Sequence, residues 1–135
     1  MATLAHKPSH LDPRSIYWID AFGSFAFGLA LIVAAGPLTD LAGWTVPAAF
    51  LVGVGLFLLP WALFNLIIAR QVIPAIGMVR VNIAGDAIWV LASLALVLSQ
   101  VSQLTTLGLT LLVGQALMVA AVGVVKLVGA RAITS

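Results

Sequence analysis

The stretch VPAAFLVGVGLFLLPWALFNLIIA, from Val46 to Ala69, contains no charged side chain. An α-helix rises 1.5 Å per residue, so about 20 consecutive apolar residues cross the hydrocarbon core of a bilayer. This stretch is therefore predicted to form a membrane-spanning helix. Pro47 falls in its first turn, where a missing N–H costs little. Pro60 falls inside it, where we expect a kink.

The rest of the chain has the same character. Of its 135 residues, 63% are hydrophobic and only 7% are charged. A soluble domain carries about 25% charged residues, because its surface faces water. The four Asp, two Lys and four Arg of this chain are too few for such a surface. The composition therefore indicates an integral membrane protein. Its net charge of +2 is scattered along the chain, which excludes a nucleic-acid surface.

Four apolar runs of spanning length predict an all-α fold, a transmembrane up-down-up-down four-helix bundle. The predicted spans are residues 16–35, 46–69, 81–98 and 104–128. The expected connections are short and comprise residues 36–45, 70–80 and 99–103. The domain division is a cytoplasmic polar tail at 1–15, a transmembrane domain at 16–130 and a second cytoplasmic tail at 131–135. The polar tail does not resemble a cleavable signal, so the first span is expected to be retained.

The basic residues all fall on one side of the predicted bundle, in or next to its two termini and its middle loop. They are Lys7, Arg14, Arg70, Arg80, Lys126 and Arg131. The other two loops contain a single charged residue, Asp40. The positive-inside rule then predicts that both termini are cytoplasmic. We expect a multi-pass protein of the bacterial inner (plasma) membrane.

A layer of polar residues is predicted near the cytoplasmic face. Asp20 and Asp86 each lie six residues after an arginine, about 9 Å further into the bilayer. The candidate polar layer consists of Asp20, Asp86, Asn65, Asn82 and Ser24. One interpretation is a protonatable or ion-binding pair of carboxylates that faces an inner cavity. The other is structural: the carboxylates accept hydrogen bonds from the layer or pair with Arg70, Arg80 or Lys126. Their shallow depth favours the structural interpretation.

Two tryptophans, Trp61 and Trp89, are expected at similar depth in the second and third spans. They form a candidate groove for a lipid, quinone or pigment, although two bulky core residues at one level are the commoner situation. No cofactor is predicted. Gln115, in the middle of the last span, is expected to bond to neighbouring backbone. The chain has no cysteine, and its two histidines, His6 and His10, flank a proline in the polar tail, so no metal site is predicted.

Small residues on the helices predict close packing. Ser24 and Gly28 form a small-xxx-small pair in the first span, and Ala116 and Ala120 form another in the last. Packing within the bundle is the simpler interpretation, and self-association through the last span is the alternative. The matching spacings Arg14-x5-Asp20 and Arg80-x5-Asp86 also suggest a duplicated helical hairpin, with a parallel arrangement of the two copies.

Several short motifs resemble a group of small bacterial four-helix integral membrane proteins to which no activity is assigned. They are Ile19-Asp20-Ala21, Gly36-Pro37-Leu38, Gly53 to Pro60, Asn82 and Trp89 to Ser93. The resemblance implies the fold and the membrane, and nothing about chemistry.

The leading functional hypothesis is a non-enzymatic scaffold or accessory subunit of a membrane complex. Its partners would be the lipid bilayer, other membrane subunits or a second copy bound through the last span. The alternative is a small oligomeric proton- or ion-coupled transporter that uses the cytoplasmic-side carboxylates. An enzyme is the least favoured class, since neither a nucleophile–base pair nor a metal-ligand set is visible.

Overall fold

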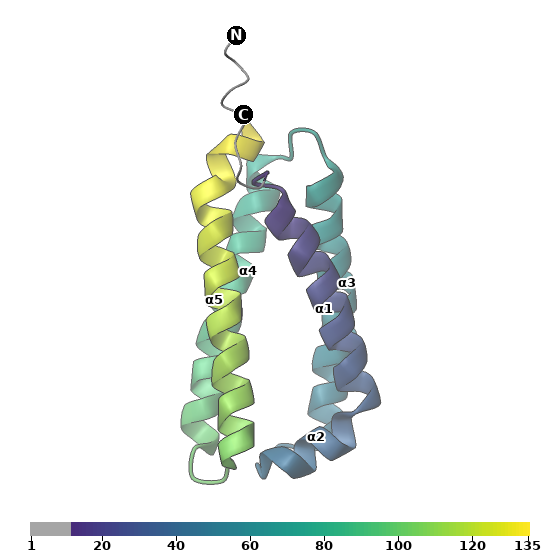
Figure 1. Ribbon diagram of the computed structural model, residues 1–135, viewed down its shortest axis with the longest axis vertical. Helices are drawn as coiled ribbons and strands as arrows, with labels where there is room; N and C mark the ends of the chain where they lie inside the picture. Colours follow the sequence, from purple (N-terminus) through teal and green to yellow (C-terminus); the bar gives the residue numbers. More distant parts are fainter. Residues whose placement is uncertain (1–11) are drawn as a thin grey trace.

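The computed structural model describes residues 12–135, which fold into five helices and, within that range, no strand (Figure 1). The helices are α1 (Ser15–Val33), α2 (Ala35–Ala42), α3 (Ala48–Arg70), α4 (Ile76–Gln100) and α5 (Thr106–Thr134). All but α2 are long and apolar enough to cross a membrane. The predicted all-α four-helix bundle is therefore confirmed. Most of the expected N-terminal tail, with Lys7 and both histidines, lies outside the described residues.

Two helix boundaries differ from the expected spans. α4 begins at Ile76 rather than at residue 81, and α5 continues to Thr134 rather than ending near residue 128. In both places the predicted boundary lay near a basic residue. The third span was expected to begin after Arg80, and the fourth was expected to end before Arg131. A helix of a membrane protein can continue beyond the hydrocarbon core, where charged side chains meet water, so neither arginine ends a helix.

The loop expected at residues 36–45 is wrong for most of its length, because α2 occupies residues 35–42. Gly36 and Pro37 were expected to end the first span. Instead α1 and α2 are separated by Ala34 alone. Pro37 lies in the first turn of α2, where its nitrogen would have no helical partner in any case. α2 ends at Gly43, whose φ of 72° is left-handed and favours glycine.

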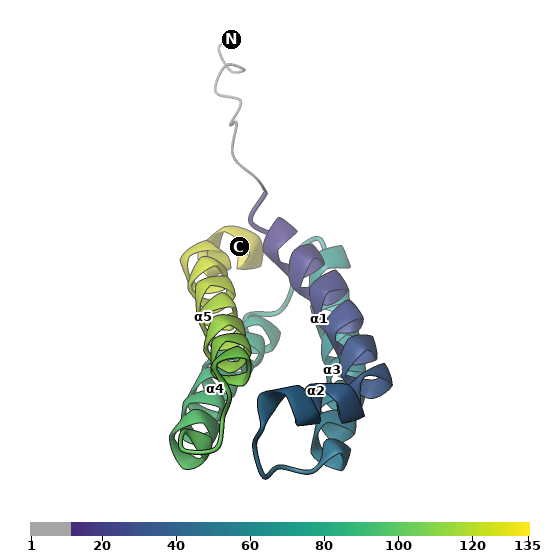
Figure 2. The same ribbon diagram turned by 60° about the horizontal axis from the view of Figure 1, so that its bottom comes forward.

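The four long helices form two hairpins, α1 with α3 and α4 with α5 (Figures 1 and 2). The first hairpin is tight because two glycines meet at its crossing. A Cβ added to Gly28 would lie 2.9 Å from the carbonyl oxygen of Gly55, and one added to Gly55 would lie 2.6 Å from that of Gly28. Ser24, one turn before Gly28, is also buried. The small residues of the first span therefore pack inside the bundle.

The two hairpins meet at both ends of the bundle. At the end with the chain termini, five buried residues form an apolar cluster that we call the apolar plug: Tyr17, Ile68, Ala69, Val79 and Ile133. At the other end, α2 lies against the start of α5 (Figure 2).

That second junction depends on close backbone contact. The hydroxyl of Thr105 donates to the carbonyl oxygen of Leu41 at 2.6 Å, and the Thr105 amide donates to that of Ala42 at 2.9 Å. A Cβ on Gly108 would lie 2.8 Å from the Cα of Ala42. α2 therefore bridges from the first hairpin to the second.

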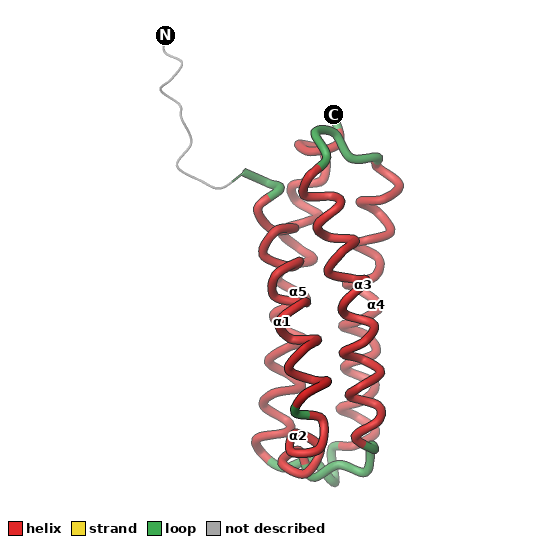
Figure 3. The backbone as a smooth tube through the Cα atoms, turned by 90° about the vertical axis from the view of Figure 1, so that its right-hand side faces the viewer, coloured by secondary structure: helices red, strands yellow, loops and turns green. Residues whose placement is uncertain are grey.

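Both described chain ends and the α3–α4 connection lie at the same end of the bundle (Figure 3). The guanidinium of Arg14, next to the start of α1, donates to the backbone carbonyls of Gln71 and Val72 in that connection. This contact attaches the start of α1 to the end of α3. Ala116 of α5 is buried inside the bundle, and self-association through α5 stays a prediction.

Candidate functional site

Lys126 of α5 points into the bundle, where its side chain is completely buried. Four oxygen atoms lie within hydrogen-bond distance of its ammonium nitrogen, Nζ. They are Oδ2 of Asp20 at 2.5 Å, Oδ1 of Asn65 at 3.0 Å, Oδ1 of Asn82 at 2.7 Å and Oδ2 of Asp86 at 2.8 Å. An ammonium group has three N–H donors, so these acceptors satisfy all of them. We call these five residues the Lys126 cluster.

The cluster joins all four long helices. Asp20 comes from α1 and Asn65 from α3, whereas Asn82 and Asp86 come from one face of α4, one turn apart. The two asparagines also bond to each other, since Asn82 Nδ2 donates to Asn65 Oδ1 at 3.3 Å. Asn65 Nδ2 donates to the backbone carbonyl of Trp61 at 3.1 Å. These bonds fix both amide oxygens toward Lys126.

The two carboxylates outnumber the single ammonium group. With all three ionised, the cluster carries a net charge of −1 inside a bundle that spans a membrane. The side chains of Asp20 and Asp86 are only 16% and 6% exposed. Burying an uncompensated charge in a membrane protein is costly, so residues of this kind are functional candidates. One additional positive charge would therefore make the cluster neutral.

Two aromatic rings lie near the ammonium group of Lys126. Nζ of Lys126 lies 5.1 Å from the ring centroid of Tyr17 and 5.9 Å from that of Trp61. Both distances allow cation–π attraction. The Tyr17 hydroxyl is buried and has no hydrogen-bond partner among the described residues. The other charged residues described are exposed or half-buried, and none forms an ion pair with the cluster.

The structure brings the whole predicted polar layer together, with Ser24 donating to Oδ1 of Asp20 at 2.8 Å. Lys126 organises the layer, and it is one of the three basic partners that the structural interpretation offered the carboxylates. Lys126 was counted among the cations at the membrane surface, but it is 1% exposed in the interior. One signal in the sequence could have placed it: Lys126 precedes Arg131 by five residues, as Asn65 precedes Arg70. Both therefore lie at the same depth.

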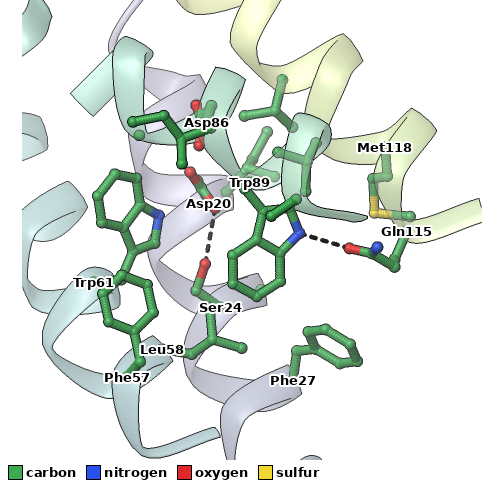
Figure 4. Close-up of a pocket in the computed structure, with 17 residues that line it drawn as sticks. Asp20, Ser24, Phe27, Phe57, Leu58, Trp61, Asp86, Trp89, Gln115 and Met118 are labelled. Carbon is green, nitrogen blue, oxygen red and sulfur yellow. Dashed lines mark hydrogen bonds between the residues drawn. The ribbon is translucent and has the colours of Figure 1, made fainter. Parts of the chain in front are cut away.

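A cavity of about 750 Å³ lies between the two hairpins and reaches the Lys126 cluster. All four long helices line it, mostly with apolar and aromatic side chains (Figure 4). Its polar lining residues are Asp20, Ser24, Asp86 and Gln115, together with the indoles of Trp61 and Trp89. The volume is in the range of small-molecule sites, which are concave, largely apolar and carry a few polar groups.

Trp89 is held in place by a short chain of hydrogen bonds. Its indole N–H donates to Oε1 of Gln115 at 2.7 Å. Nε2 of Gln115 in turn donates to Oγ of Ser93 and to the carbonyl oxygen of Leu112, both at 2.9 Å. The expected backbone bond of Gln115 is therefore present, but its main partners are side chains that the sequence did not identify. They orient the Trp89 ring against the cavity.

Trp61 is positioned by aromatic packing instead. Its ring stacks on Phe57 with centroids 6.0 Å apart and meets the edge of Phe64 at 5.6 Å. The ring also lies directly against Gly85 of α4, where any side chain would collide with it. Trp61 thus fills the seam between α3 and α4 while one side of it lines the cavity.

The cavity is not enclosed, and its exposed lining residues fall on two flanks of the bundle. On one flank the lining residues Phe27 of α1 and Met118 of α5 are 39% and 68% exposed. On the other, Phe57 of α3 and Ile88 of α4 are 52% and 65% exposed. These positions lie within the spanning helices, so both flanks face the hydrocarbon of a bilayer. The cavity can therefore be reached from lipid.

Within residues 12–135, no group of three or more His, Cys, Asp or Glu side chains is placed to hold a metal ion. His6 and His10 fall outside that range. Comparison with known proteins found no matching protein family, no matching curated protein and no matching solved structure. The resemblance to small bacterial four-helix membrane proteins thus stays a prediction.

Proposed function

We propose that this protein is a small membrane carrier whose Lys126 cluster binds and releases a proton. This proposal corresponds to the transporter, which was the alternative hypothesis drawn from the sequence. The observation that supports it is the position of two aspartates, both bonded to one lysine, at the border of a ligand-sized cavity. A scaffold or accessory subunit needs no such cavity.

The charge of the cluster is the basis for the coupling to protons. Asp20 and Asp86 together with Lys126 are neutral only when one additional positive charge is present. In a site screened from water that charge is either a proton, shared by the two carboxylates, or a cation that enters the cavity. The titratable groups that face one another are Asp20 and Tyr17 from α1, Asp86 from α4 and Lys126 from α5, whereas α3 contributes the uncharged Asn65.

The shape of the bundle supports alternate access to the cluster. On its cavity side, Asp20 is partly exposed. On its other side the apolar plug lies between the cluster and the end with the chain termini: Ile133 follows Lys126 by two turns on the same face of α5, and the Tyr17 ring lies against Nζ. Carriers expose a central site to one side at a time. The present arrangement is closed at the plug, and the proposed cycle separates the hairpins there.

The proposed orientation places the plug end toward the cytoplasm of a bacterial cell, in the inner membrane. Four arginines, Arg14, Arg70, Arg80 and Arg131, mark this end. Lys126 no longer contributes to the surface charge, but the arginines alone keep the bias toward one side.

Infrared spectroscopy tests the proton-binding centre without any substrate. Wild-type protein in lipid vesicles, titrated across the physiological pH range, should show a carbonyl band of a protonated carboxyl group that appears or disappears with pH. Asp20→Asn and Asp86→Asn should each remove this titration, because either change leaves the cluster neutral. Asp40→Asn is the matched control, since Asp40 is exposed on α2. A wild-type spectrum with no titrating carboxyl band, or one lost equally in the control, would refute the proposal.

A further inference from the structure

We infer that the cavity binds a lipophilic organic cation, a molecule with one delocalised positive charge and an apolar body. The inference rests on the function proposed above and names its substrate class. The cation and the proton would be alternatives: one proton leaves the carboxylate pair of Asp20 and Asp86 as one cation enters, and the cluster is neutral in both states.

The sign of the ligand follows from the charge that borders the cavity. The charged side chains that line it are both carboxylates, Asp20 and Asp86, whereas Lys126 is completely buried behind them. An anion would meet surplus negative charge there, and a neutral ligand could not replace the proton that neutralises the carboxylate pair. A monovalent cation compensates it fully, so electrostatic complementarity selects this class.

The aromatic lining gives the cation a second attraction. Trp61 and Trp89 both line the cavity, and in the view of Figure 4 the hydrogen bond between Asp20 and Ser24 lies between their rings. Indole faces attract cations, most strongly where water is excluded. Both rings are held before a ligand arrives, Trp89 by Gln115 and Trp61 by its aromatic neighbours. A preorganised site of this kind loses little entropy on binding.

The route of entry explains why the cation must be lipophilic. The cavity reaches the bundle surface through exposed lining residues such as Phe27 and Met118, which face lipid. The apolar plug closes the end with the chain termini, and α2 lies across the opposite end. A small hydrated cation does not dissolve in hydrocarbon, but a cation that spreads its charge over apolar groups does. The apolar cavity walls suit the body of such a molecule.

Binding of tetraphenylphosphonium to the protein in lipid nanodiscs is the direct test. Empty nanodiscs correct for partition into lipid, and tetraphenylborate, an anion of almost the same shape, is the charge-reversed control. We expect saturable binding of the cation only, with release of about one proton per cation bound. The proton count is measured by calorimetry in two buffers that differ in ionisation enthalpy.

Variants then locate the site. Asp20→Asn and Trp89→Leu should each weaken tetraphenylphosphonium binding by at least about tenfold, which corresponds to about 1.4 kcal/mol. Asp40→Asn and Trp18→Leu, which alter a carboxylate and an indole outside the cavity lining, should leave it unchanged. Equal binding of the borate, or no effect of Asp20→Asn, would overturn the inference. If the infrared titration is present but the phosphonium does not bind, the substrate class is wrong and the proton centre stands; if both are absent, both proposals are wrong.

Discussion

Replacing Lys126 with methionine should destabilise the protein more than any other single change in the cluster. Methionine keeps much of the length of the side chain and removes its charge, so two buried carboxylates remain without their common partner. Oδ2 of Asp20 lies 2.5 Å from Nζ and Oδ2 of Asp86 lies 2.8 Å from it. The two oxygens are therefore at most about 5.3 Å apart, the total of the two distances.

The magnitude follows from that separation. At a pH where both carboxylates are ionised, two unit charges about 5.3 Å apart repel by about 3 kcal/mol at an effective dielectric constant of about 20. Removal of one partner from a buried ion pair costs about 3–5 kcal/mol in other proteins. We therefore expect Lys126→Met to lower the free energy of unfolding by about 3–5 kcal/mol. Asp86→Asn should cost only about 1 kcal/mol or less, because it leaves Lys126 paired with Asp20 and removes the surplus charge.

The decisive measurement is a rescue. The triple variant, with Lys126→Met, Asp20→Asn and Asp86→Asn, has no charge left in the cluster and should recover most of the stability lost in the single Lys126→Met protein. Unfolding of the purified proteins in mixed micelles is followed by tryptophan fluorescence during titration with SDS. Arg131→Met, on the exposed face of the same helix, is the matched control and should change stability by less than about 0.5 kcal/mol. A triple variant no more stable than Lys126→Met alone would refute the electrostatic reasoning.

Three other predictions use different parts of the fold. Gly55→Ala places a methyl group 2.6 Å from the carbonyl oxygen of Gly28 and should cost about 1–3 kcal/mol in the same unfolding assay, whereas Gly53→Ala meets nothing within 4 Å and should be neutral; similar effects would contradict the crossing. Gln115→Leu leaves the Trp89 indole N–H without its acceptor and should cost about 1–3 kcal/mol, while Gln103→Leu, at an exposed glutamine, should cost less; equal costs would argue against the bond. Reporter fusions at each terminus should both be active in the cytoplasm, and activity of either one outside the cell would exclude the proposed orientation.

Much of the candidate site was predictable from local spacing. Asp20 and Asp86 follow arginines by the same number of residues, which placed them at one depth, and Asn82 precedes Asp86 by one helical turn. Depth and helix face follow from residue spacing along a single helix, so both can be predicted from the sequence. Which basic residue pairs with the carboxylates cannot be predicted in this way, because the partner lies on another helix. A lysine near the end of a span can extend to the membrane surface or turn inward, and only the neighbouring helices decide which.

The connection after the first span shows the same limit at the level of secondary structure. Gly36 and Pro37 are typical of a helix end, which is what the sequence predicts there. Both residues are also compatible with a first helical turn, and α2 begins at Ala35. Its contact with the start of α5, through Thr105 and Gly108, is a long-range contact that no local pattern contains. Tertiary packing therefore decides whether these residues end one helix or begin another.

The sequence by itself determined that the chain lies in a membrane as four helices. This follows because backbone groups in hydrocarbon must bond within their own helix, and uncharged runs of spanning length are counted directly along the chain. The tertiary structure alone decided that the helices pair as two hairpins with a cavity between them, and that Lys126 turns inward to meet Asp20 and Asp86. Both depend on which helix faces meet, and that is set by close contacts such as Gly28 with Gly55 rather than by any pattern within one helix.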